Sequence, residues 1–214
     1  MEPRIRPYQP QDLAAVYEVC LRTGDAGRDA SHLIDDPDIL GHLYVGPYVT
    51  LEPELAFVLE DAQGVCGYVL GALDSERFEQ RFRCEWLPRL RPRYPAPSGE
   101  PASWSATEQL YHRLHHPGSD LPEALRTYPS HLHIDLLERA QGRGHGRRMM
   151  RRLLSALREH GSYGVWLGVD RRNERAIGFY RTVGFMTIAS GYEASTTLFM
   201  AMPLGRRPAT PTSV

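Results

Sequence analysis

The segment that most constrains this chain spans residues 131–146, HLHIDLLERAQGRGHG. It opens with the pattern of a β-strand and ends in three glycines spaced two apart, Gly142, Gly144 and Gly146. An amphipathic helical stripe follows at once, with apolar residues at positions 150, 153, 154 and 157. Glycines between a strand and a helix N-terminus let a ligand approach backbone N–H groups that have no partner inside the helix. The segment therefore predicts a loop that binds a phosphate or diphosphate group.

The spacing of these glycines distinguishes between types of phosphate loop. A dinucleotide fingerprint, G-x-G-x-x-G, needs a third glycine where this chain has Arg147, and the sequence contains no Gly-Lys-Ser/Thr tripeptide of a Walker A loop. The loop itself, residues 141–146, reads QGRGHG and fits Gln/Arg-x-x-Gly-x-Gly/Ala. That pattern resembles the acetyl-CoA loop of the GCN5-related N-acetyltransferases, the GNAT superfamily. A glycine turn kept for packing is the alternative for this loop taken alone.

A second motif, in residues 173–185, supports the same resemblance. Asn173, Ala176, Tyr180, Gly184 and Phe185 occupy all five fixed positions of the family's N-x-x-A-x-x-x-Y-x-x-x-G-F signature. A predicted helix and a predicted buried strand, residues 165–169, join the two motifs. The resemblance implies an α/β (α+β layered) GNAT fold, in which a central mixed, mostly antiparallel, twisted sheet splays between two strands and is flanked by helices.

The rest of the chain fits one such domain, predicted over residues 1–204. Further strands are predicted at 5–8, 54–60, 67–73, 186–190 and 197–202, and further helices at 12–21 and 36–44. Residues 74–130 form a long proline-rich insertion before the central strand, with helices expected at 75–87 and 105–115. Its aromatic residues either wall the acceptor side or form a satellite cluster. The Pro/Ser/Thr-rich residues 205–214 are predicted to be a disordered tail.

A narrower resemblance covers residues 24–54 and 130–146. These stretches look like the acetyltransferase-like domain found fused to O-GlcNAc hydrolases and like its free-standing bacterial relatives. Some members of that subgroup have lost the cofactor loop, whereas this chain keeps the loop intact. The resemblance therefore implies acetyl-CoA (coenzyme A) as the cofactor.

Composition argues against several other partners. The net charge is -1 and the pI is about 6.8, so no global basic field favours nucleic acid or an anionic membrane. No apolar run approaches the roughly 20 residues that span a bilayer. Three cysteines without a C-x-x-C spacing indicate reduced thiols and a cytoplasmic location. The resemblance also suggests a homodimer, in which the closing strands of two copies pair.

The resemblance also implies which residues bind acetyl-CoA. Backbone groups near Leu136 and Leu137 would pair with the pantetheine arm, and main-chain donors of the glycine loop would hold the diphosphate. Asn173 would contact the pantetheine region, and Phe179 would form a wall beside it. The implied cofactor-binding residues are Leu136, Leu137, Gln141, Gly142, Arg143, Gly144, His145, Gly146, Arg147, Asn173, Phe179 and Tyr180.

Acetyl transfer to an amine needs two proton transfers. The motif implies that Tyr180 donates a proton to the departing CoA thiolate, which suits a phenol with an ordinary pKa of about 10. The amine must be neutral when it attacks, so a base is expected on the acceptor side, with Asp135 ranked first and His133 second. These two residues share a face of a regular strand, but a bulge, usual in this strand of the family, would reverse that parity. The position that carries a base in other members corresponds here to Ser130 or to Leu132, and a leucine cannot act as a base.

Two other functions are alternatives. His131, His133 and Asp135 have the spacing of metal ligands on one strand, so a metal-dependent hydrolase is the rival enzyme. That hypothesis leaves both motifs unexplained, and no metal site is predicted. The alternative from another class is a catalytically inactive pseudo-acetyltransferase, a module that binds acetyl-CoA or a partner without turnover.

The acceptor is predicted only as a primary amine of unknown identity. Asp25, Arg28 and Asp29 lie in a polar glycine loop, residues 23–29, between the first two predicted helices. In acetyltransferases of this kind that region borders the acceptor, so these residues are candidates for contacting it. A solvated loop is the equally weighted alternative.

Overall fold

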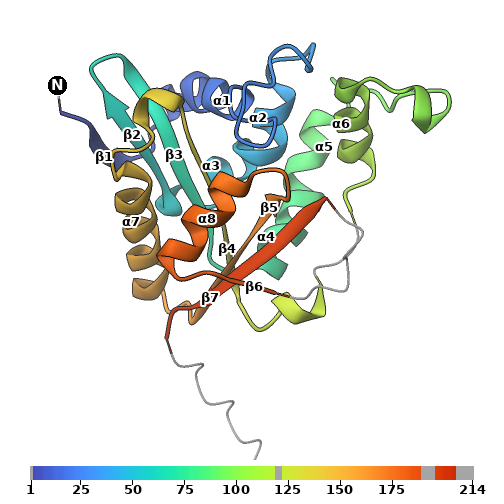
Figure 1. Cartoon of the computed structure of the whole chain (residues 1–214). Helices are drawn as coiled ribbons and strands as arrows, with labels where there is room; N and C mark the ends of the chain where they lie inside the picture. Colours follow the sequence, from blue (N-terminus) through green and yellow to red (C-terminus); the bar gives the residue numbers. More distant parts are fainter. Residues whose placement is uncertain (1, 119–121, 189–195, 206–214) are drawn as a thin grey trace, which may run out of the picture.

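A seven-stranded sheet forms the centre of the protein (Figure 1). The computed structural model describes residues 2–118, 122–188 and 196–205. The sheet order is β1-β2-β3-β4-β5-β7-β6, and every neighbouring pair is antiparallel except β4 and β5. The strands are β1 Arg4–Pro7, β2 Ala56–Asp61, β3 Gly64–Ala72, β4 Ser130–Leu136, β5 Gly164–Asp170, β6 Met186–Thr187 and β7 Thr197–Pro203. The predicted mixed, mostly antiparallel sheet is confirmed.

The sheet splays between β4 and β5. In the described residues, these two strands pair at Ser130 with Val165 and at His131 with Trp166, both near the start of β4. Beyond that point β4 stays in unbroken register with β3, from Ala72 opposite His131 to Gly67 opposite Leu136. β5 is meanwhile paired along its length with β7. The two strands therefore diverge toward their carboxyl ends, as the fold predicts.

Helices cover both faces of the sheet, because alternate strand residues point to opposite sides. α1 Leu13–Leu21, α2 Ile39–Tyr44 and α3 Gly46–Leu51 share one core with Tyr68 and Leu70 of β3. α7 His145–Glu159 and α8 Glu174–Val183 share the other core with Val69, the residue between them. α7 is strongly amphipathic: its apolar stripe is buried, and its other face carries exposed arginines.

The insertion, residues 74–130, contains the two predicted helical segments. The first is α4 Ser75–Arg81, a π-helical turn Phe82–Trp86 and α5 Leu87–Leu90; the second is α6 Ala106–His115, which begins with a capping box between Ser105 and Glu108. Both pack onto α2 rather than on a separate cluster, since their buried residues belong to the α1–α2 core. The Trp86 indole N–H donates to the His42 carbonyl at 2.8 Å. The satellite-cluster alternative is therefore wrong.

Other boundaries differ from the predicted ones. The helix predicted at 36–44 begins at Ile39, and the unpredicted α3 follows it directly. The strand predicted at 186–190 is described for Met186 and Thr187; its end and the predicted tail from 206 onward lie outside the described residues. Short 3-10 turns occur at Pro10–Asp12, Pro53–Leu55, Pro101–Ser103, Glu123–Leu125 and Glu138–Ala140. Among the described residues no helix combines the length and the apolarity that crossing a membrane requires.

Candidate functional site

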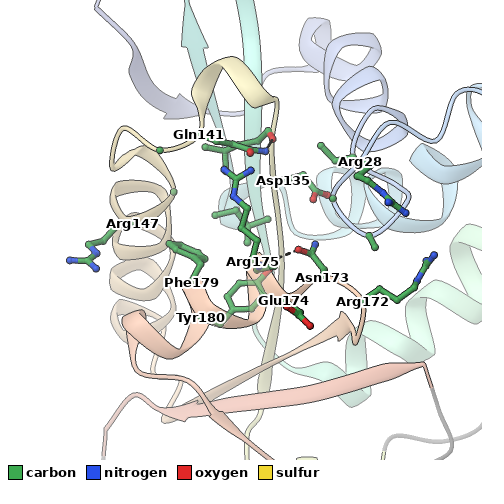
Figure 2. Close-up of a pocket in the computed structure, with 18 of the residues that line it drawn as sticks. Arg28, Asp135, Gln141, Arg147, Arg172, Asn173, Glu174, Arg175, Phe179 and Tyr180 are labelled. Carbon is green, nitrogen blue, oxygen red and sulfur yellow. Dashed lines mark hydrogen bonds between the residues drawn. The ribbon is translucent and has the colours of Figure 1, made fainter.

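A cavity of about 740 Å³ opens where β4 and β5 diverge (Figure 2). Three regions line it: the loop after α1, the segment from the end of β4 to the start of α7, and the first turns of α8. Ten of the predicted site residues line this cavity: Asp135, Leu136, Gln141, Gly142, Gly144, Gly146, Arg147, Asn173, Phe179 and Tyr180. The splay of the sheet therefore brings both sequence motifs to one place.

The glycine loop presents open backbone to this cavity. Gly142 and Gly144 adopt φ values of +73° and +79°, in the left-handed region that favours glycine. A Cβ at either position would have no protein atom within 4 Å, so both glycines face free space. Gly144 is the N-cap of α7, and the bond from Arg148 N to the Gly144 carbonyl, at 3.1 Å, opens the helix. The N–H groups of residues 145–147 precede that bond, and a helix N-terminus of this kind suits a diphosphate.

Two neighbours hold the glycine loop in place. The Gln141 side-chain amide donates to the Leu136 carbonyl at 2.6 Å, which ties the loop to the end of β4. A Cβ at Gly146 would lie 3.4 Å from the Phe179 ring, so a glycine lets α7 approach α8 closely. Gln141 and Gly146, two fixed residues of the loop motif, thus have different structural roles: Gln141 anchors the loop, and Gly146 allows close helix packing.

Three of the predicted cofactor residues do not line the cavity. The Leu137 N–H already donates to the Cys66 carbonyl at 2.8 Å, so it is not available to a pantetheine arm. Arg143 is exposed on the loop, outside the lining. The His145 side chain is buried, and its Nδ1 has no hydrogen-bond partner among the described residues. For His145, whose side chain is buried, the backbone is left as the cofactor contact.

Asn173 caps α8 and contacts the loop after α1. Its Oδ1 accepts a hydrogen bond from Ala176 N at 3.0 Å. Its amide packs against Gly27, where a Cβ would lie 2.8 Å from Asn173 Nδ2. Asp25 adds an ionic link between the same segments, because its carboxylate pairs with Arg28 at 2.9 Å and with Arg172 at 3.2 Å.

The acidic residues of the predicted acceptor loop are therefore not a free anionic patch. The Asp25 side chain is 14% exposed and neutralised by two arginines. Asp29 caps the turn at Ser31 N, at 2.9 Å, and does not line the cavity. Of the three candidates in this loop, Arg28 lines the cavity, whereas Asp25 and Asp29 do not.

Asp135 and Tyr180, the two candidate proton-transfer residues, both line the cavity. Burial and the nearby negative charge of Asp135 raise the pKa of the Tyr180 phenol, so it stays protonated. Its hydroxyl makes no hydrogen bond to any described residue. Asp135 Oδ2 accepts two hydrogen bonds, from Tyr68 Oη at 2.6 Å and from His133 Nε2 at 2.7 Å. Because burial raises the pKa of Tyr68 well above its ordinary value, that phenol is the donor to Asp135.

His133 lies behind Asp135 and does not line the cavity. Its ring stacks between Tyr44 and Tyr68, with centroid distances of 6.0 and 5.7 Å. Since β3 and β4 pair in unbroken register, no bulge reverses the parity, and both residues share one face of β4. The geometry thus gives Asp135 access to the cavity and makes His133 its hydrogen-bond partner.

The other strand candidates have structural roles. Ser130 is buried and donates from Oγ to the Leu73 carbonyl at 2.6 Å, and Leu132 is buried in the core. His131 Nδ1 shares a hydrogen bond of 2.9 Å with Ser75 Oγ, and burial lowers the pKa of the ring to about 3. In the part of the chain that the structure describes, no three His, Cys, Asp or Glu side chains converge as metal ligands. The metal-dependent hydrolase thus lacks the ligand geometry that it needs.

Sequence reasoning missed several residues of the cavity wall. Arg172, Glu174 and Arg175 line it, and Figure 2 shows the Arg175 side chain extending along the cavity toward Gln141. A signal exists for Arg175, because it precedes Phe179 by four residues and so falls on the same helix face. Arg172 lies before the N-cap Asn173, and the helical period does not predict it. With Arg28 and Arg147, these arginines give the cavity an excess of positive charge.

Comparison with known proteins agrees with this geometry. Residues 104–185 match the sequence profile of the Acetyltransferase (GNAT) family. The solved structure of SsHAT is 41% identical, with a TM-score of 0.88 over 96% of this chain and 100% of that one. Protein O-GlcNAcase from Rattus norvegicus and from Mus musculus is 33% identical over 86% of this chain, which spans about a fifth (20%) of those relatives.

More distant structures share the fold. The yncA protein from Salmonella typhimurium, solved with its cofactor acetyl-CoA, has a TM-score of 0.56 over 98% of each chain, at 16% identity. The chain belongs to the GNAT acetyltransferase family, and it shares homology with the acetyltransferase-like part of the O-GlcNAcases.

Proposed function

We propose that this protein is an acetyl-CoA-dependent N-acetyltransferase that transfers the acetyl group directly to a primary amine. One observation carries the proposal: the cavity at the splay combines an open glycine loop at a helix N-terminus with Asp135 and Tyr180. A phosphate-binding end and two proton-transfer groups within one cavity are what direct transfer from a CoA thioester requires.

The residues of this cavity fit acetyl-CoA. Main-chain N–H groups of residues 144–147 would bind the diphosphate, and the cavity's arginines would balance its charge. Leu136 and Asn173 would contact the pantetheine arm, and Phe179 would cover it. The fit rests on Gly142 and Gly144. Neither residue has a Cβ, and no protein atom lies within 4 Å of the Cβ position, so a ligand has room beside the backbone.

The protein's own contribution is to position groups and move two protons. When bound, acetyl-CoA supplies a thioester whose carbonyl carbon forms a bond to the amine nitrogen while its bond to sulfur breaks. Asp135 takes up the proton that the amine loses, with Oδ2 held by Tyr68 and His133 and with Oδ1 free of described donors. Tyr180 Oη donates the proton that the departing sulfur receives.

A pseudo-acetyltransferase is the second candidate, because cofactor binding alone needs the glycine loop and not the proton-transfer groups. Asp135 and Tyr180 favour turnover, since both polar groups face the cavity in which the loop lies. Binding and turnover are separable by experiment, so the two candidates have different outcomes.

The first test is acetyl-CoA titration by calorimetry. Gly144→Glu places a negative charge in the diphosphate position, and micromolar binding by the wild type should be lost. Gly161→Glu is a matched control, because Gly161 also has a positive φ (+87°) and free space at its Cβ, but lies after the other end of α7. Both variants carry the same backbone strain, about 1–2 kcal/mol.

Three results are informative. Loss of binding in Gly144→Glu with retention in Gly161→Glu supports the cofactor site. Equal loss in both would point to backbone strain rather than to the diphosphate contact. No binding by the wild type would overturn the proposed function, whereas binding without acetylation of any amine in a broad acceptor screen would favour the pseudo-acetyltransferase.

A further inference from the structure

A second cavity, of about 970 Å³, lies between the insertion and the sheet. Most of its lining belongs to the insertion, with Ser75, Glu79 and Arg83 on α4 and the π-helical turn and Arg113 on α6. Tyr44 of α2, His131 of β4 and Trp166 of β5 complete it. Its volume is in the range of pockets that bind small molecules.

One face of β4 links the two cavities. Residues 131, 133 and 135 point to the same side, because the strand is in regular register. Asp135 lines the first cavity and His131 lines the second. His133 lies between them and stacks on Tyr44, which lines the second cavity. The side chains of His131, His133 and Asp135 therefore form one row along β4 from the second cavity to the first.

His131 offers a hydrogen-bond donor to this second cavity. The Trp166 indole N–H donates to Ser75 Oγ at 3.0 Å, so the Ser75 hydroxyl hydrogen is free to donate to His131 Nδ1 at 2.9 Å. With Nδ1 as the acceptor, the hydrogen of the neutral ring is on Nε2. No described residue accepts a hydrogen bond from Nε2. The cavity wall thus carries a neutral ring that, in this tautomer, offers a donor to a ligand.

Arg113 contributes a positive charge to the second cavity. The other cavity arginines have carboxylate partners, since Arg83 pairs with Glu79 at 2.7 Å and Arg126 lies 3.9 Å from Glu76. Arg113 has no carboxylate within 4 Å among the described residues. It donates instead to Tyr44 Oη at 2.6 Å, which orients the guanidinium beside the ring that stacks on His133. The cavity therefore has an uncompensated positive charge and a neutral donor.

We propose that the second cavity binds the acceptor, and that this acceptor is a small amine that also carries a carboxylate or phosphate group. Arg113 pairs with the anion, because a guanidinium matches the geometry of either group. The amine lies toward Asp135, on the side of His133. This inference rests on the proposed function, because it assigns the acceptor of the same reaction.

The test measures binding of three probes with the same carbon chain: 6-aminohexanoate, 6-aminohexyl phosphate and 6-aminohexanol. Ligand-observed NMR titration with saturating CoA should show the wild type preferring at least one anionic probe over the alcohol by about tenfold. The two anionic probes distinguish carboxylate from phosphate. Arg113→Gln should reduce the preference to about twofold or less and leave the affinity for the alcohol unchanged.

A matched control is Arg89→Gln, because Arg89 is an exposed arginine of the same insertion that does not line the cavity. It should retain the preference of the wild type. Tyr44→Phe removes the acceptor that orients Arg113 and should weaken binding of the anionic probe selectively, which a merely structural role would not do. Calorimetry with CoA on each variant verifies that the first cavity is intact.

The two proposals fail differently. If CoA does not bind to the wild type, the proposed function fails. If CoA binds but the probes bind equally, or none binds at millimolar concentration, the acceptor inference alone is overturned. An unchanged preference in Arg113→Gln, with Arg89→Gln also unchanged, overturns the role of Arg113.

Discussion

The surroundings of Tyr180 keep its phenol protonated and therefore able to act as an acid. It lies on α8, where the ring is buried beside Phe179 and Phe185. Burial raises the pKa of the phenol, and a phenol that stays protonated at neutral pH can donate a proton. A hydroxyl without a described protein partner, facing the cavity of the glycine loop, is available for that donation.

We expect Tyr180→Phe to reduce kcat by about a hundredfold, because the loss of a general acid costs on the order of 10²–10⁴. The acetyl-CoA dissociation constant should change little, since the ring remains. Steady-state kinetics with any accepted amine, together with calorimetry, measures both quantities. Tyr111→Phe is the control, because it removes a tyrosine hydroxyl that bonds to Asp36 in another part of the protein. An unchanged kcat in Tyr180→Phe would contradict the acid role.

At this scale the sequence predicts individual motif residues better than their partners. Gly144, Asn173 and Tyr180 occur in patterns with fixed spacing, so their positions follow from the chain alone. The hydrogen bond between Tyr68 and Asp135 cannot be predicted in this way. The two residues lie 67 positions apart in the sequence, and the register of β3 and β4 brings them together. His145 was predicted as a cofactor residue, but the start of α7 turns its side chain into the protein.

Among the elements, the corner between α2 and α3 determines how the insertion packs. Gly46 begins α3, and a Cβ at this position would overlap the Trp86 ring of the π-helical turn. Trp86 in turn donates to the His42 carbonyl of α2. The close approach lets the insertion join the α1–α2 core, and it also brings α4 and α6 to the wall of the second cavity.

We expect Gly46→Ala to lower the free energy of unfolding by about 1–3 kcal/mol, because one methyl group must displace a packed indole. Urea denaturation measures this change. Gly178→Ala, in α8, is the control: no atom lies within 4 Å of its Cβ position, so alanine should be neutral or stabilise by up to about 1 kcal/mol. Equal stability of the Gly46 variant and the wild type would mean that the ring can move at little cost.

Element positions were predictable where the pattern was local. The helical segments of the insertion and the amphipathic α7 follow from periodicity and from caps such as Ser105. α3 was missed because its six residues, GPYVTL, include a proline and two β-branched residues, and its helical form depends on packing against the sheet. The short pairing of β4 with β5 is a property of two strands far apart in sequence, so only the family resemblance predicted it.

For the whole molecule, the splay divides the sheet into two parts that meet along a short parallel pairing. The first cavity opens at this gap, lined on one side by the end of β4 and on the other by the turn after β5 and the first turns of α8. Asp25, in the loop after α1, spans the gap through its ion pair with Arg172 after β5, at 3.2 Å. A ligand in the cavity contacts both parts at once, so binding should stabilise the segments that border the gap.

We expect saturating acetyl-CoA to slow amide hydrogen exchange in three segments: residues 23–28, 141–147 and 173–180. Binding at a hundred times the dissociation constant stabilises the bound form by about 2.7 kcal/mol, which corresponds to about hundredfold slower exchange for amides that open only when the ligand leaves. α6, in the insertion, does not line this cavity and should show less change at sites that open locally. Gly144→Glu should show no protection in any of the three segments. Protection confined to 141–147 would mean that the ligand contacts the glycine loop without bridging the gap.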